Sequence, residues 1–207
     1  MNGAVSRSAV TLILFLVWGL SIAVGFHQVI KYENTPGKAA KSQADWPADS
    51  RIVPVAERYN LVMVAHPRCP CTRASLEELR KLISRHPSKL AAHLLFLMPA
   101  GVGPEWEHSE LRRTAESIRG LTVRTDEEGT EAARFGGLTS GHVVVYDPSG
   151  KQVFSGGLTS GRGRAGESVG VVTIDRLLNG ASNLPMHAPV FGCPLFNTEK
   201  CHPKEPE

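Results

Sequence analysis

The chain has 207 residues, room for one ordinary domain with extensions, and its composition is globular, 42% hydrophobic and 21% charged. The formal net charge is only +3, and its basic residues are scattered, which argues against a nucleic-acid-binding protein. The aromatic content of 6% argues against a base-stacking surface, and the glycine-rich stretch around residue 160 lacks the lysine spacing of a phosphate-binding loop.

The chain begins with a hydrophobic segment. Residues 9–26 run for 18 residues without a charge, close to the roughly 20 needed to cross a bilayer. We therefore predict that residues 1–30 are a single membrane anchor and that the rest lies outside the cytoplasm. A cleaved signal peptide is the alternative, because Ser21-Ile22-Ala23 is a small-x-small sequence, and the lysines that follow the segment weakly favour the opposite orientation.

The segments on either side of the central domain are poor in periodic pattern. Residues 31–51 contain two prolines and no apolar period, which predicts a linker. The domain is expected over residues 52–180. Residues 181–207 are rich in proline and contain Cys193 and Cys201, so we expect an extended tail that wraps the domain.

Strands and helices alternate within the domain. The apolar run 61–65 predicts a strand, and leucines at helical spacing follow it over residues 76–83. The turn sequence Asp-Pro-Ser-Gly separates the last two strands, which predicts an antiparallel hairpin. The later elements are expected in this order: strand 90–98, helix 107–118, strand 121–125, helix 127–134, strands 142–147 and 151–156, and helix 167–179. This order predicts an α/β domain, a mixed sheet with helices on both faces, whose reactive groups lie beyond the carboxyl ends of strands.

Two cysteines stand at such a strand end, in the sequence LVMVAHPRCPCTRASLEEL (residues 61–79). A thiol is a nucleophile as its thiolate, and the amino end of a helix stabilises that anion. Pro70 suits a first helical turn, where a missing N–H costs nothing. His66, Arg68 and Arg73 add positive charge, so Cys69 is expected to have a lowered pKa.

This stretch resembles the thioredoxin superfamily, and in particular its membrane-tethered, extracytoplasmic thiol–disulfide branch. There a strand leads into a C-x-x-C motif followed by a sequence similar to RASLEEL. The resemblance continues through FGGLTSGHVVVYDPSGKQVFSGG (135–157) and spans about residues 59–180. The PVFGCPL tail with the CPCT turn also resembles a small group of bacterial thioredoxin-like proteins labelled RedB. The resemblance to the membrane-tethered thioredoxin branch implies a thioredoxin-like fold and a periplasmic or exterior domain on a bacterial cell membrane. It also implies protein thiols or disulfides as partners.

The chain departs from that family at two positions. Cys69 matches the family's exposed nucleophile, but the resolving cysteine falls on Thr72, and Cys71 lies between the two motif positions. The family's cis-proline falls on Gly141, preceded by Ser140. The resemblance implies that this proline shapes the partner groove and keeps metals from the dithiol, so its loss leaves metal binding open.

The hexapeptide GGLTSG occurs at 136–141 and again at 156–161. One copy precedes the hairpin and the other follows it. Since an antiparallel hairpin brings its open ends together, both copies are expected at the end of the sheet where Cys69 emerges. The expected rim of the site is Thr139, Ser140, Gly141, Thr159 and Ser160, with Arg162 and Arg164 as a positive edge.

Three functions fit these residues. The first is a thiol–disulfide oxidoreductase without a cofactor, in which Cys69 attacks and either Cys71 or Cys193 resolves, unless Cys193 and Cys201 form a structural disulfide. The second is Cu(I) binding by Cys69 and Cys71 with His66, and with His142 nearby. The third is a non-catalytic tethered binding module. Zinc fits less well, because neither cysteine cluster supplies four well-spaced ligands. Peroxidase chemistry fits less well, because the residues three positions before Cys69 and Cys71 are His66 and Arg68 rather than threonine.

Overall fold

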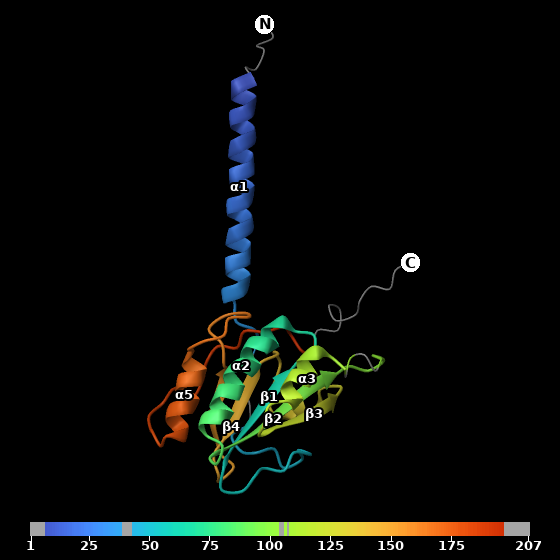
Figure 1. The fold of residues 1–207 in the computed structure, drawn as a ribbon, viewed down its shortest axis with the longest axis vertical. Helices are drawn as coiled ribbons and strands as arrows, with labels where there is room; N and C mark the ends of the chain where they lie inside the picture. Colours follow the sequence, from blue (N-terminus) through green and yellow to red (C-terminus); the bar gives the residue numbers. More distant parts are fainter. Residues whose placement is uncertain (1–6, 39–42, 104–105, 107, 197–207) are drawn as a thin grey trace. The chain divides into compact units, whose positions relative to one another are not determined.

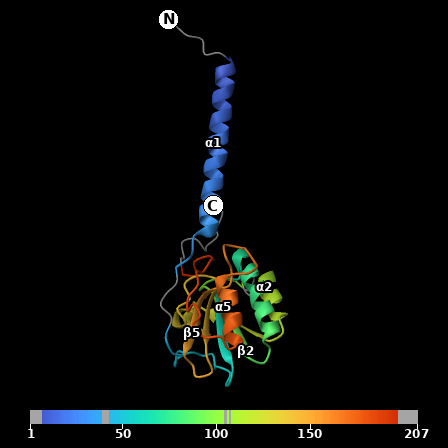
Figure 2. The ribbon, with the colours of Figure 1, turned by 90° about the vertical axis from the view of Figure 1, so that its left-hand side faces the viewer.

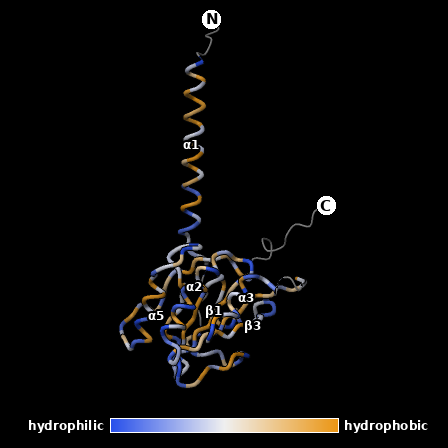
Figure 3. Tube along the Cα trace, in the orientation of Figure 1, coloured by the Kyte–Doolittle hydropathy of each residue, from blue (hydrophilic) through white to orange (hydrophobic). Residues whose placement is uncertain are grey.

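The computed structural model describes residues 7–38, 43–103, 106 and 108–196. Contacts divide the chain into two compact units, one ending at Thr35 and one beginning at Pro36. The first unit is the helix α1 (Arg7–Asn34), which has no buried residue and contains hydrophobic residues along much of its length (Figure 3). Its 28 residues span about 42 Å, more than the ~30 Å hydrocarbon core. Helix α1 therefore has the length and composition of a membrane span or a signal sequence.

The second unit is built on a five-stranded sheet in the order β3-β2-β1-β4-β5 (Figure 1). Strand β1 pairs in parallel with β2, and β2 with β3, while β4 is antiparallel to both β1 and β5. The predicted hairpin is confirmed, and Asp147 closes its turn by accepting hydrogen bonds from the backbone N–H groups of Ser149 and Lys151. The strands are β1 (Tyr59–Ala65), β2 (Leu90–Met98), β3 (Leu121–Glu127), β4 (His142–Tyr146) and β5 (Gln152–Gly157).

Helices cover both faces of the sheet, as the alternation of elements predicts. One core lies between the sheet and α2 (Pro70–Arg85), α3 (Glu110–Glu116) and α5 (Val169–Leu178), of which α2 and α5 lie side by side in Figure 2. The other core lies under the short helix α4 (Thr130–Arg134) and non-helical segments. The three later helices are shorter than predicted, because Ser109, Gly129 and Ser168 cap them; residue 107 lies outside the described residues.

The linker predicted over residues 31–51 is wrong at both of its ends, because α1 continues to Asn34 and the last residues pack on the second core. Trp46 packs edge-on against Phe135 and Tyr146, with ring centroids 5.1 and 5.0 Å apart, and its Nε1–H donates to the carbonyl of Ile52 at 3.2 Å. A single tryptophan in a polar sequence gives no periodic pattern, yet its ring is large enough to anchor the segment to the second core.

The tail wraps the domain as far as it is described. His187 forms a parallel bridge with Ser155 of β5, and Pro194 forms an antiparallel bridge with Thr139. The tail therefore covers the free edge of β5 and then reaches the loop before β4. Cys201 lies outside the described residues.

Candidate active site

Cys69 lies between the carboxyl end of β1 and the first turn of α2. It is the N-cap residue, with extended backbone angles, and Pro70 occupies the first turn. The carbonyl of Cys69 accepts a hydrogen bond from the backbone N–H of Thr72 at 3.1 Å. The helix thus begins where the proline pattern predicted, and it aims its free N–H groups towards the cysteine turn.

The tail brings a second thiol to this turn. The Sγ atoms of Cys69 and Cys193 are 3.1 Å apart, although the residues are 124 positions apart in the chain. Both are free thiols, as is Cys71. Cys69 is only 2% exposed, whereas Cys71 and Cys193 are half-buried. The expectation of an exposed nucleophile is therefore wrong for this arrangement, because the tail lies against the sulfur.

The contacts among the three thiols shift their pKa values in opposite directions. The Cys193 thiol, and after it the Cys71 thiol, hydrogen-bonds to Cys69 and lowers its pKa far below the ordinary value, against the opposing effect of burial. The same contact with Cys69 raises the pKa of Cys193. For Cys71, the hydrogen bond with Cys193 lowers the pKa, but the contact with Cys69 and burial outweigh it and the pKa is raised. A lowered pKa of Cys69 was expected; its principal cause, the distant Cys193, was not.

His66, predicted as a supporting residue, is buried next to the thiols. Its Nδ1 accepts a hydrogen bond from the backbone N–H of Arg68 at 3.1 Å, and its ring packs edge-on against Trp106 at 5.0 Å. Burial lowers the pKa of His66, while the charge of Cys69 raises it in part. The guanidinium of Arg68 stacks over Trp106 at 4.6 Å. Trp106 thus covers this side of the turn, and no local motif in the sequence marked it.

Thr72 and Ser140, also predicted as supporting residues, join the turn to the loop before β4. Their hydroxyl oxygens are 2.7 Å apart, and Ser140 Oγ accepts from the backbone N–H of His66 at 2.9 Å. Thr72 Oγ1 also donates to the carbonyl of His66 at 3.4 Å. The hydroxyl of Thr72 therefore links the cysteine turn to the loop before β4.

Gly141 stands at the position that the sequence comparison aligned with a proline, and the backbone explains a glycine there. Its φ is +89°, and a Cβ at this position would lie 2.9 Å from Ser75 Oγ. The Gly141 N–H donates to the carbonyl of Val64 at 2.8 Å, a bond that proline cannot make. The loop is held against β1 by this bond.

The predicted basic residues divide into two groups. Arg73 forms an exposed ion pair with Glu110 at 3.3 Å, so it adds little to the field at Cys69. Arg162 donates to the carbonyl of Gly192, and its charge acts on Cys71. Arg162 therefore lies beside the tail near Cys71, whereas Arg73 lies on the outer surface.

The two GGLTSG copies contribute unequally to the predicted rim. Ser140 and Gly141 lie at the site, and Thr139 pairs with the tail while its hydroxyl donates to the carbonyl of Lys38 at 2.6 Å. In the second copy Thr159 is buried and Ser160 is exposed. Arg164 is exposed.

The predicted copper ligands are only partly brought together. His142 is 1% exposed, and its Nε2 bonds to Ser155 Oγ at 2.8 Å. Burial lowers its pKa to about 4. Within the described residues, no group of three or more His, Cys, Asp or Glu side chains has the arrangement of a metal site.

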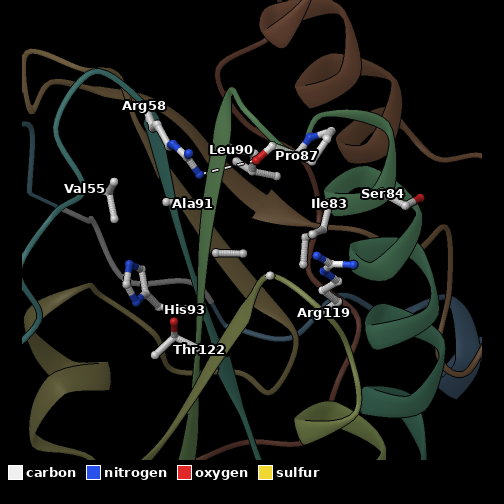
Figure 4. A pocket seen from close by; sticks show the side chains of 12 residues that line it. Val55, Arg58, Ile83, Ser84, Pro87, Leu90, Ala91, His93, Arg119 and Thr122 are labelled. Atoms are coloured by element: carbon white, nitrogen blue, oxygen red, sulfur yellow. Dashed lines mark hydrogen bonds between the residues drawn. The ribbon is translucent and has the colours of Figure 1, made fainter.

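A pocket of about 580 Å³ lies at the other end of the sheet, around the first residues of β2 and β3 (Figure 4). Arg58 and Arg119 stand at its rim, and His93 lines it. Neither ring nitrogen of His93 has a hydrogen-bond partner among the described residues, and burial lowers its pKa to about 4. Strand β1 runs away from this pocket towards Cys69, so the pocket takes no part in the thiol site.

Comparisons with known proteins bear on the fold. No protein-family model and no curated protein matches the chain. Among solved structures, an uncharacterized conserved protein from Geobacillus kaustophilus is 21% identical, with a TM-score of 0.57 over 78% of this chain and 92% of that one. A hypothetical protein from Sinorhizobium meliloti is 20% identical, with a TM-score of 0.57 over 78% and 93%.

A third structure, a secreted disulfide oxidoreductase from Mycobacterium tuberculosis, is 12% identical, with a TM-score of 0.45 over 61% of this chain and 84% of that one. The likeness to the first two structures, at 20–21% identity, concerns the fold alone. The mixed five-stranded sheet, with helices on both faces and a cysteine turn at the end of β1, has the thioredoxin-like fold that the sequence predicts.

Proposed function

We propose that this chain is a thiol–disulfide oxidoreductase in which Cys69 of the C-P-C-T turn is the nucleophile and Cys193 of the tail is its redox partner. The 3.1 Å contact between their Sγ atoms carries the proposal. Helix α1 would tether the domain to a bacterial cell membrane, facing the periplasm or the exterior, where disulfides persist. Its partners would be protein thiols or disulfides.

The reaction needs only the chain and its partner. The Cys69 thiolate attacks one sulfur of a partner disulfide; that S–S bond breaks, a mixed disulfide forms at Cys69, and the other partner sulfur leaves as a thiolate. Cys193, after losing its proton, then attacks Cys69 Sγ and releases the second partner thiol. The partner gains two electrons and the chain retains a Cys69–Cys193 disulfide. A thiol or dithiol reductant reverses these steps.

Geometry favours Cys193 over Cys71 as that partner. A disulfide bond of about 2.05 Å requires the Cys69 and Cys193 sulfurs to approach by only about 1 Å. A bond between Cys69 and Cys71 would close a very small ring across Pro70 and strain the first turn of α2. Cys71, half-buried beside them, lowers the pKa of Cys69 and is placed to assist the exchange.

Exchange with a model disulfide tests the proposal. We expect Cys69→Ser to abolish reduction of a protein disulfide by the reduced chain, and Cys193→Ser to accumulate a mixed disulfide at Cys69. Cys71→Ser, the matched control within the same cluster, should keep partial activity. Equal activity of the wild type and Cys69→Ser would refute the oxidoreductase.

Copper binding is tested by the same variants. The cluster offers soft thiolates for Cu(I), with His66 beside them. A copper protein would retain one Cu(I) per chain against a competing chelator and lose it in Cys69→Ser/Cys71→Ser. A tethered binding module, by contrast, would neither exchange disulfides nor retain copper.

A further inference from the structure

The tail crosses the site as an extended strand. The backbone N–H of Ser140 donates to the carbonyl of Cys193 at 2.8 Å, and the N–H of Leu195 donates to the carbonyl of Leu138 at 2.9 Å. These two bonds flank Pro194, which therefore needs no N–H of its own. Residues 192–195, here called the strap, thus occupy the backbone edge of the loop beside Cys69.

The strap packs so closely against this edge that its first residue, Gly192, cannot be replaced by a residue with a side chain. A Cβ on Gly192 would lie 1.8 Å from the carbonyl oxygen of Ser140, which is backbone and has no room to move. At the other end of the strap, Leu195 is 4% exposed and belongs to the core on the second face of the sheet. Arg162 holds the strap from outside through the carbonyl of Gly192.

The position of the strap explains why a residue proposed as a nucleophile is 2% exposed. A partner protein cannot bring a disulfide sulfur to Cys69 while the strap covers it. Backbone edges of this kind are also where extended peptides add to a sheet. The strap and an extended segment of a partner therefore compete for the same N–H and C=O groups of residues 138–140.

We propose that the strap is a displaceable lid that must lift before Cys69 reacts, and that its return both resolves the mixed disulfide and expels the partner. This inference rests on the proposed oxidoreductase function. With both thiols reduced, the strap is held only by noncovalent contacts and can open. When Cys193 attacks Cys69 on its return, the new disulfide fixes the strap in place, and reduction by a thiol releases it. Access to the site is thus set by its own redox state.

The alkylation rate of Cys69 tests this device in the full-length chain. The background is Cys71→Ser/Cys193→Ser, in which peptide mass mapping reports Cys69 separately from Cys201. A serine at 193 keeps the backbone pairing of the strap, and it removes the Cys193 thiol, the principal cause of the lowered pKa of Cys69, from every variant compared. We expect Gly192→Val to raise the rate with iodoacetamide roughly tenfold or more, because the valine cannot seat against Ser140.

Two further variants provide an independent test of the strap and a control. Arg162→Met removes one outer contact and should raise the rate roughly twofold to fivefold, even if Gly192→Val fails to fold. Met186→Val, at a tail position that is 51% exposed, is the control and should leave the rate unchanged. Thermal melting checks that each variant is folded.

The outcomes separate the lid from the chemistry. Equal alkylation rates in the background and in the folded Gly192→Val and Arg162→Met variants would overturn the lid, even where the wild type exchanges disulfides. Faster alkylation in these variants supports the lid, and it does so even if the wild type fails to exchange disulfides, a failure that would count against the oxidoreductase.

Discussion

The two copies of GGLTSG, residues 136–141 and 156–161, have identical sequences but differ in the burial of their leucine and serine side chains. In the first copy Ser140 is 0% exposed and joins the cysteine turn to the loop, whereas Leu138 is only half-buried. In the second copy Leu158 is 0% exposed in the main core, whereas Ser160 is exposed. The surroundings of each copy, and not its sequence, therefore decide which of its side chains is buried.

What the copies share is the tail. The first copy pairs with the strap through Ser140 and Leu138. The second copy begins at the end of β5, where a Cβ on Gly157 would lie 2.7 Å from the carbonyl oxygen of Pro189. Both hexapeptides therefore leave room for the chain that brings Cys193 to Cys69. Each copy of the repeat therefore packs against a different part of the tail.

The leucines should show the largest difference between the copies. Leu158→Ala removes a fully buried side chain, so we expect it to lower the free energy of unfolding by about 2–5 kcal/mol. Leu138→Ala, the matched change in the first copy, should cost about 1 kcal/mol, because that side chain is half-buried. Urea denaturation measures both. Equal losses would contradict the assigned burial.

The serines should show the reverse order. Ser140→Ala leaves the buried backbone N–H of His66 without its acceptor, which we expect to cost about 1–3 kcal/mol. Ser160→Ala changes an exposed side chain and should stay within about 0.5 kcal/mol. The same denaturation series compares them. A larger loss for Ser160→Ala than for Ser140→Ala would reverse the account of the two copies.

Gly157→Ala tests the close contact between the end of β5 and the tail at Pro189. The added methyl group meets the backbone at Pro189, so we expect a loss of about 1–2 kcal/mol together with faster alkylation of Cys69. Stability falls in this case while the reactivity of a distant thiol rises. If the alkylation rate stayed at the wild-type value, the tail would not depend on β5 for its path.

The pH dependence of Cys69 reactivity tests the contact between Cys69 and Cys193. The pKa of Cys69 lies below the ordinary 9.0 in the folded, reduced chain, principally because Cys193 donates a hydrogen bond to it. The resulting stabilisation is fully present above the unfolded pKa of about 9 and is lost as the pH falls towards the folded pKa. The alkylation rate of Cys69 in the wild type should therefore stay nearly constant between about pH 9 and about pH 6. In Cys193→Ser the rate should fall steeply over the same range. The same steep decline in the wild type would show that Cys193 does not lower the pKa.

Local patterns in the sequence predict most of the fold. The apolar run of β1, the leucine spacing of α2 and the turn at Asp147 each involve neighbours along the chain, and each element forms where expected. Pro70 likewise marks the start of α2 and places Cys69 at the strand end. Such features depend on contacts within a few residues, which a single sequence records.

The features that the sequence did not predict depend on contacts between residues that are far apart in the chain. Nothing near Cys193 in the sequence shows that it meets Cys69, and a tryptophan at 46 or 106 shows no period that would place it in a core or beside His66. One signal was available: glycines in both hexapeptides and at 192 indicate close backbone approach, which a wrapping tail would require.

The disulfide of the oxidised chain tests the central claim most directly. Mild oxidation, alkylation of the remaining thiols and peptide mass mapping identify which sulfur is bonded to Cys69. The 3.1 Å contact predicts a Cys69–Cys193 link. A Cys69–Cys71 link, with Cys193 alkylated, would contradict both the redox pair and the strap that closes over it.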